Sequence, residues 1–262
     1  MKRLAAAPVL CLVLLSVLPA NSPARAGEAE TLALHVEQNM GAEAFAAARV
    51  LHFTWAVERD GQQVVAYEHT WDRWTGDYRV EGVDRESGKP WLAIFDIDSR
   101  EGRVWLADEA VPGEALAAHL ERAYGRFIND TYWLLMPWKW RDPGVHLARV
   151  GDETVNGREC AVVELTFGEV GLTSNDRYRG YVDHETGRMV RWSYVLQDEE
   201  GKPGSSEPTV WDWTGWVEVD GVWFSERKER VGGDGPPVAI TTHGIELHAE
   251  PSAEQLAAWF QQ

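Results

Sequence analysis

An alternation of apolar and polar residues with a period of two, broken repeatedly by hairpin dipeptides, is the feature that most limits the fold of this chain. Large apolar residues occupy every second position from Leu51 to Val57, and the alternation recurs from Val65 to Trp71, where His69 takes one of the positions. Asp60-Gly61 lies between these segments, and such dipeptides are preferred in two-residue β-hairpin turns. Asn156-Gly157 and Asp220-Gly221 repeat the signal further along the chain. The pattern predicts successive antiparallel strands.

Helical patterns interrupt this alternation in only three places. We expect helices near residues 28–48, with a break at Gly41, near residues 113–128, and near residues 252–260, where Ser252 and Gln255 have capping-box spacing. A mainly β chain with a few helices (α+β) predicts one large curved antiparallel sheet or barrel rather than a parallel α/β fold. An immunoglobulin-like sandwich stays an alternative, although the central helix is out of place in it.

The first residues have the order of a secretory signal. Lys2 and Arg3 precede an apolar stretch that reaches about Ala20, and Ala24-Arg25-Ala26 follows with small residues around a cleavage point. A membrane anchor is the alternative, but two prolines interrupt the stretch, which is shorter than the roughly 20 apolar residues that a spanning helix needs. We expect residues 1–26 to be cleaved and residues 27–262 to form a single periplasmic domain. Cys11 lies inside the apolar stretch, where no lipidation cysteine is placed.

The net charge of the chain narrows the classes of partner that it can bind. The net charge of −17 becomes more negative still after loss of the signal, which removes three basic residues and no acidic one. Such a surface repels phosphate backbones, so we expect no nucleic-acid partner.

Only Cys160 is left after cleavage, so no intramolecular disulfide forms. The apolar neighbours of Cys160 predict a small core residue rather than a nucleophile.

Tryptophan is unusually frequent, with 14 residues, and indole is often found where an apolar wall meets water or a ligand. Several rings fall on one face of the predicted strands, and ordinary core packing is the alternative for each of them. The candidate lining of a ligand cavity comprises Phe53, Trp55, Tyr67, Trp71, Trp192, Tyr194, Trp211 and Trp213. In the second half we place Val190 on the same face as Trp192, and Val217 on the same face as Trp213.

Signals for catalysis and for metal binding are weak. There is no Gly-x-Ser-x-Gly elbow, and acid pairs such as Asp96 with Asp98, or Glu164 on the side of Val162, are coincidental in a chain with 42 acidic residues. His243 and His248 are the closest histidine pair, but their spacing puts them on opposite faces of a regular strand. We predict no catalytic residue, no metal and no cofactor.

One aromatic segment stands apart from the strands. Asn129-Asp130-Thr131 predicts a turn, and the dense apolar run from Trp133 to Trp140 is either central core or a cavity wall. Pro137 disfavours a central strand there and indicates an edge or a bend.

Three stretches resemble exported bacterial proteins of the LolA/LolB-like fold, in particular an uncharacterised branch of it. They are Asn129 to Pro137 together with Asp142 to Val145, then Asp183 to Gly187, then Asp220 to Phe224. The resemblance implies an incompletely closed antiparallel barrel whose apolar concave side is covered by helices. Better-known members hold lipoprotein acyl chains there, and the resemblance implies no catalytic residues. This chain lacks their lipobox cysteine and matches none of their functional positions, so lipoprotein transport is not carried over.

Two functions therefore stay open. The first is a non-catalytic periplasmic carrier or binding protein for a hydrophobic ligand, such as a lipid, an acyl chain or a lipidated partner. The second is an envelope hydrolase that acts on polysaccharide, with tryptophans as sugar platforms and a carboxylate pair. A cavity with apolar walls favours the first, and two close carboxylates over exposed indole favour the second.

Overall fold

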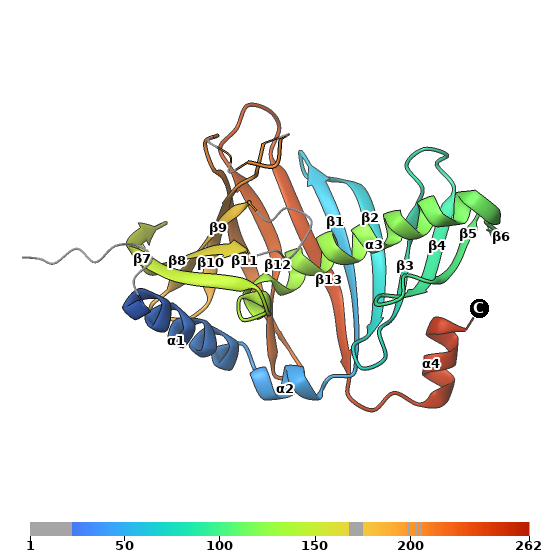
Figure 1. The fold of residues 1–262 in the computed structure, drawn as a ribbon, viewed down its shortest axis with the longest axis horizontal. Helices are drawn as coiled ribbons and strands as arrows, with labels where there is room; N and C mark the ends of the chain where they lie inside the picture. The colour runs from blue at the N-terminus through green and yellow to red at the C-terminus, as the bar shows by residue number, and fades with distance from the viewer. Residues whose placement is uncertain (1–22, 168–174, 199, 203, 205, 262) are drawn as a thin grey trace, which may run out of the picture.

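A computed structural model describes residues 23–167, 175–198, 200–202, 204 and 206–261, and the described strands form one antiparallel sheet (Figure 1). The strand order is β6-β5-β4-β3-β2-β1-β13-β12-β11-β10-β9-β8-β7. The strands are β1 (Val50–Arg59), β2 (Gln62–Asp72), β3 (Asp77–Val83), β4 (Pro90–Asp96), β5 (Gly102–Leu106), β6 (Glu109–Ala110), β7 (Val145–Val155), β8 (Arg158–Phe167), β9 (Arg177–Asp183), β10 (Met189–Val195), β11 (Thr209–Val219), β12 (Val222–Val231) and β13 (Val238–His248). Because β6 and β7 form the two edges and do not pair, the barrel is unclosed, as predicted.

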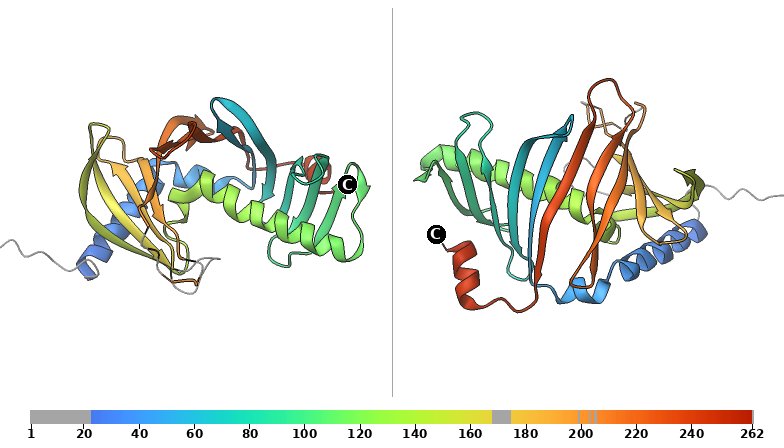
Figure 2. Two further views of the ribbon diagram at one scale, coloured as in Figure 1. Left: turned by 90° about the horizontal axis from the view of Figure 1, so that it is seen from above. Right: turned by 180° about the vertical axis from the view of Figure 1, so that it is seen from behind.

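The sheet curves around one long helix. The helices are α1 (Pro23–Asn39), α2 (Ala42–Ala47), α3 (Gly113–Leu135) and α4 (Ala253–Phe260), and a 3-10 helix η1 (Met136–Lys139) continues α3. Figure 2, seen from above, shows α3 running along the concave side. Helix α1 packs near β7, whereas α4 lies at the other end of the molecule near β3. The predicted arrangement of helices on the concave side is confirmed for α3.

The predicted hairpin turns are present where the dipeptides occur. Asp60 and Gly61 have φ angles of 54° and 75°, and the same pair of positive angles recurs at Asn156-Gly157 and at Asp220-Gly221. Two successive residues with positive φ define the type I′ turn, whose twist matches that of the flanking strands. Local chemistry therefore fixes these three hairpins.

The predicted break at Gly41 separates α1 from α2. Its φ is 91°, and a Cβ atom there would lie 2.0 Å from the carbonyl oxygen of Gly221. Both the left-handed conformation and the close approach require glycine. The end of the β11–β12 hairpin is thereby held against the N-terminal helices.

A large hydrophobic core fills the concave side, and a smaller cluster lies on the outer face of β8. The large core contains Phe53, Trp192 and Trp213, among many others. The smaller cluster contains the free thiol Cys160, which is fully buried as predicted. Burial raises the pKa of this thiol, so the thiolate needed for nucleophilic chemistry is disfavoured.

The aromatic segment before residue 140 differs from the prediction. Helix α3 continues through residues 129–131 to Leu135, where a turn was predicted. Within it, the Thr131 hydroxyl donates to the Phe127 carbonyl at 2.5 Å. Asp130 is fully buried against the sheet. Polar residues with turn propensity are therefore held in the helix by tertiary contacts, and Pro137 lies in η1 rather than at a strand edge.

Two strands depart from strict alternation. A register shift between Met189 and Arg191 places Val190 against the outer cluster, on the opposite side from Trp192, which corrects the predicted shared face. In β11, Gly215 has φ 62°, and Trp216 rather than Val217 packs on the large core. Irregularities of this kind change the face of the sheet toward which the following side chains point, without ending the strand.

The expected signal peptide falls mostly outside the described residues, which begin at Pro23. Residues 23–26, around the expected cleavage point, form the start of α1. None of the helices in the described part of the chain is long and apolar enough to cross a membrane.

Candidate functional site

Helix α3 is fixed over the concave face by a buried polar contact near its C-terminal end. The Tyr78 hydroxyl and His69 Nδ1 are 2.8 Å apart, and His69 Nε2 lies 3.2 Å from Asp130 Oδ2 without the alignment of a hydrogen bond. All three side chains are fully buried. Burial, with the nearby Asp130 charge, raises the pKa of Tyr78 well above its usual value, so Tyr78 stays protonated. Two neighbouring strands thus hold one side of α3.

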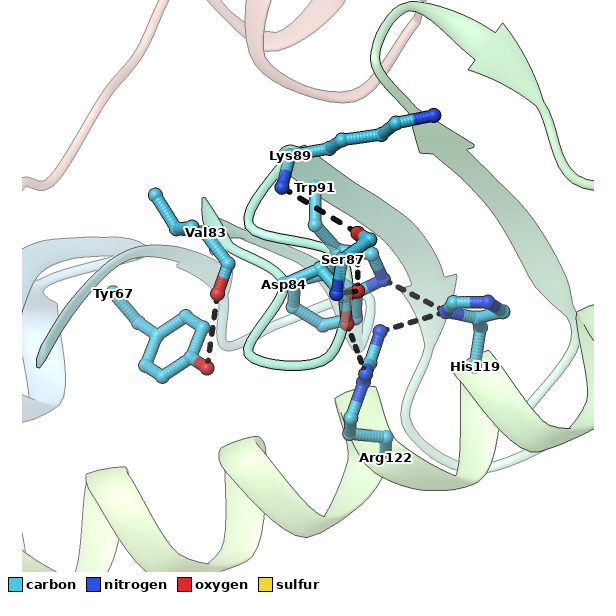
Figure 3. Close-up of polar contacts among 8 residues, drawn as sticks. All are labelled: Tyr67, Val83, Asp84, Ser87, Lys89, Trp91, His119 and Arg122. Carbon is cyan, nitrogen blue, oxygen red and sulfur yellow. Dashed lines mark hydrogen bonds and ion pairs between the residues drawn. The ribbon is translucent and has the colours of Figure 1, made fainter.

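A second polar cluster fixes the N-terminal half of α3 to the β3–β4 hairpin (Figure 3). Arg122 pairs with Asp84, and Asp84 Oδ2 also accepts from the Ser87 hydroxyl at 2.5 Å. These hydrogen bonds outweigh burial and lower the pKa of Asp84 to about 2. His119 Nδ1 accepts from Trp91 Nε1 at 3.2 Å and lies 2.7 Å from Arg122 Nη2. A ring nitrogen that accepts from two donors carries no proton.

This cluster holds a serine, a histidine and an aspartate without forming a catalytic triad. In a triad the histidine accepts the serine proton. Here the Ser87 hydroxyl is directed to Asp84 instead, and His119 Nδ1 is engaged by Trp91 and Arg122. The cluster therefore acts as a structural clamp, and together with the buried Asp130 contact it determines where α3 lies over the sheet.

An aromatic pocket of about 520 Å³ lies between the C-terminal half of α3 and strands β7 to β10. This volume falls within the roughly 300–1,000 Å³ that is usual for small-molecule sites. We refer to it as the aromatic pocket, and its residues are Gly125, Ile128, Asn129, Tyr132, Trp133, Lys139, Asp142, Pro143, Val145, Phe167, Asp176, Tyr178, Trp192, Tyr194 and Leu196. Leu196 is 51% exposed and Ile128 is 37% exposed, which places apolar side chains at its mouth.

The walls of the aromatic pocket are rings in mutual contact. Trp192 is central, with ring centroids 4.7 Å from Trp133, 5.4 Å from Tyr132, 5.6 Å from Tyr178 and 5.7 Å from Tyr194. Tilted and edge-on arrangements at these distances are favourable for aromatic pairs. The wall is thus preorganised by its own packing.

Several indole N–H groups in this interior lack hydrogen-bond acceptors. Among the described residues, no partner meets the buried Nε1 atoms of Trp192, Trp211 and Trp213, and four further tryptophans share this condition. A buried donor left without an acceptor costs roughly 1–3 kcal/mol. Native proteins contain few such groups, and each calls for an explanation. The concave interior is therefore apolar in its walls yet supplied with unused donors.

The two carboxylates of the aromatic pocket are engaged by neighbouring residues. Asp142 pairs with Lys139 at 2.6 Å. Asp176, which is nearly fully buried, accepts from the Tyr178 hydroxyl at 2.9 Å and from the backbone N–H of Gln197 at 2.7 Å. Carboxylates in these contacts are positioned to support the loop and the wall rather than to transfer protons.

The structure separates the eight predicted lining residues into two groups. Trp192 and Tyr194 line the aromatic pocket, and Trp211 and Trp213 contact this aromatic cluster. The other four, on β1 and β2, face the same side of the sheet, but Trp55 lines a different pocket. Trp133 also lines the aromatic pocket, in agreement with one of the two interpretations of the run from Trp133 to Trp140. Sequence reasoning missed the following wall residues: Tyr132, Phe167 and Tyr178. Helical spacing would have placed Tyr132 and Trp133 one turn beyond Ile128 and Asn129.

The acid and histidine pairs considered from the sequence lie away from the aromatic pocket. Asp96 accepts from the Ser99 backbone in the β4–β5 turn, and Glu164 pairs with Arg179 at 3.0 Å. His243 is exposed on β13. Within the described ranges no group of acidic, histidine and cysteine side chains has the arrangement of a metal site.

Comparison with solved structures identifies the fold. No family model matches the chain, and no curated protein matches it. A solved LolA superfamily protein from Nitrosomonas europaea is similar over 88% of this chain and 97% of its own, with 10% identity and a TM-score of 0.52. A DUF1329 family protein from Desulfovibrio piger is similar over 91% of this chain and 98% of its own, with 15% identity and a TM-score of 0.49. At such identities the likeness concerns architecture alone. The chain has a LolA-like fold.

Proposed function

We propose that this protein is a non-catalytic carrier or binding protein whose hydrophobic ligand, an acyl chain or lipid, occupies the aromatic pocket. The observation that carries the proposal is the pocket itself: about 520 Å³ walled by rings, with apolar residues at its mouth. Each methylene buried there contributes ~0.8 kcal/mol, so about ten contribute ~8 kcal/mol before the cost of association. Micromolar affinity at best is the expected range.

The alternative of an envelope polysaccharide hydrolase has less support. Both acids in the aromatic pocket already have partners, and the Ser87, His119 and Asp84 cluster is a clamp. A periplasmic location is part of the proposal and is supported by the signal-like residues 1–26. N-terminal sequencing of the envelope fraction should find Gly27 first, and an intact Met1 in the cytoplasm would contradict export.

Binding should be visible in tryptophan fluorescence, because Trp133 and Trp192 form the pocket wall. We expect a bromine-labelled sixteen-carbon fatty acid, and an uncharged monoacylglycerol with the same chain, to quench fluorescence saturably at micromolar concentration. Leu196→Glu should weaken both ligands at least tenfold, since it places a charge at the apolar mouth while Leu196 is already half exposed. Trp192→Glu should also weaken binding, but it alters the buried wall.

Val231→Glu is the matched control, because Val231 is a 41% exposed apolar residue on β12 that does not line the aromatic pocket. Its affinity and its thermal unfolding should equal those of the wild type. Unchanged quenching in Leu196→Glu, with folding intact, would show that the chain does not enter the aromatic pocket.

A further inference from the structure

A second, smaller pocket lies where β1 and β2 meet α3. Its volume is about 290 Å³, and we refer to it as the arginine pocket. Its residues are Trp55, Val57, Arg59, Val64, Val65, Arg85 and Arg126. None of these lines the aromatic pocket, so the two sites are separate in composition.

Positive charge in the arginine pocket is poorly compensated. Three arginines line it and no carboxylate does, in a chain with 42 acidic and 25 basic residues. Arg126 lies 3.5 Å from Asp130, but Arg59 and Arg85 form no ion pair with any residue that the structure describes. Elsewhere arginines such as Arg49 and Arg191 pair closely with carboxylates. The convergence of unpaired guanidinium groups is therefore unusual for this surface.

The remaining polar side chain of the arginine pocket is also a donor. Trp55 is only 5% exposed, and its indole N–H meets no acceptor among the described residues. The Arg126 guanidinium lies 5.3 Å from the Trp55 ring and 5.1 Å from the Tyr67 ring, which holds it in place by cation–π contact. Guanidinium and indole groups donate and do not accept. The indole N–H is shielded from the pocket space, so the guanidinium groups are the accessible donors. Charged donors without acceptors among them fit an oxyanion.

The rest of the pocket lining is apolar. Val57 and Val65 lie beside the arginines, and Val64 is 55% exposed. An inorganic ion would leave this surface unused, whereas an alkyl chain attached to the anion would cover it and bury apolar area.

We propose that the arginine pocket binds the anionic headgroup of an amphiphile, a carboxylate or phosphate, with the first part of its chain on the valines. The guanidinium groups of Arg59 and Arg85 contact the oxygens, and the Trp55 ring, whose N–H is shielded from the pocket, forms part of the wall. This site shares no residue with the aromatic pocket, so it stands or falls independently of the carrier function proposed above.

Calorimetric titration of the full chain with octyl phosphate tests the proposal. We expect Arg59→Gln/Arg85→Gln to weaken binding at least tenfold, because these two guanidinium groups contact the oxygens. The matched control Arg100→Gln/Arg230→Gln removes the same charge at exposed positions outside both pockets, and it should change the affinity less than twofold. Binding should also weaken as salt rises, because the exposed charges are screened.

Three further measurements test the chemical class of the ligand and the location of its site. Inorganic phosphate should bind at least tenfold more weakly than octyl phosphate, and equal affinity would overturn the amphiphile assignment. Uncharged octyl glucoside should not compete, and full competition would overturn the headgroup assignment. Octyl phosphate binding should survive Leu196→Glu within twofold, whereas a parallel loss would place the ligand in the aromatic pocket and overturn the arginine site.

Discussion

Replacing Asp130 with alanine is expected to lower the free energy of unfolding by about 3–5 kcal/mol, the usual cost of removing a buried carboxylate from its ion pair, here with Arg126. Asp130 is fully buried and lies 3.2 Å from His69 Nε2 and 3.5 Å from Arg126 Nη1. Alanine leaves the buried imidazole facing an empty site and frees the guanidinium. Urea unfolding at pH 7 measures the loss.

Two comparisons make the Asp130 result specific. Asp130→Asn keeps an oxygen of similar position and should lose only about 1–3 kcal/mol. Glu121→Ala removes a 71% exposed acid of α3 that pairs with Arg100 at 3.8 Å, and it should change stability by less than about 0.5 kcal/mol. Hydrogen exchange should accelerate along residues 126–135 in Asp130→Ala. A variant within about 1 kcal/mol of the wild type would contradict the anchoring role.

Replacing Lys228 with methionine is expected to have the opposite effect and to stabilise the protein by about 1–4 kcal/mol at pH 7. Lys228 is fully buried, and its Nζ donates to the Ser225 carbonyl at 2.6 Å and to Thr242 Oγ1 at 2.8 Å. No carboxylate pairs with it among the described residues. After substitution the Ser225 carbonyl still accepts from Thr242 at 2.9 Å. Methionine therefore leaves this buried carbonyl with a hydrogen-bond donor.

The stability difference between Lys228→Met and the wild type is expected to depend on pH. Burial lowers the pKa of Lys228 well below 10.5 in the folded state, whereas the unfolded chain binds the proton up to its ordinary pKa. The unfolded state therefore holds more protons between the two values, and the stability of the wild type rises with pH across that window. The advantage of Lys228→Met should shrink as pH approaches 10.5. Lys202→Met, at a 67% exposed position, should show neither effect, and a variant less stable than wild type at pH 7 would refute the prediction.

Much of the architecture could be predicted from local sequence. Alternation and the turn dipeptides predicted the antiparallel strands, and Gly41 predicted the break between α1 and α2, because each depends on backbone preferences within a few residues. The end of α3 could not be predicted in this way. Asn129, Asp130 and Thr131 have turn propensity, and only the buried contact between Asp130 and His69, far apart in the chain, keeps them helical.

The same distinction between local sequence and tertiary contacts applies to the two candidate pockets. The sequence by itself determined that a curved antiparallel sheet would present large rings on one face, since side-chain direction in a strand follows from residue parity. Only the tertiary structure decided which rings meet. Trp192 and Tyr194 join Tyr132 and Trp133 of α3 in the aromatic pocket, while Trp55 lies with Arg126 in the arginine pocket. The physical reason is that α3 is positioned by long-range polar contacts and divides the concave face, and the periodicity of a strand carries no information about what packs on it.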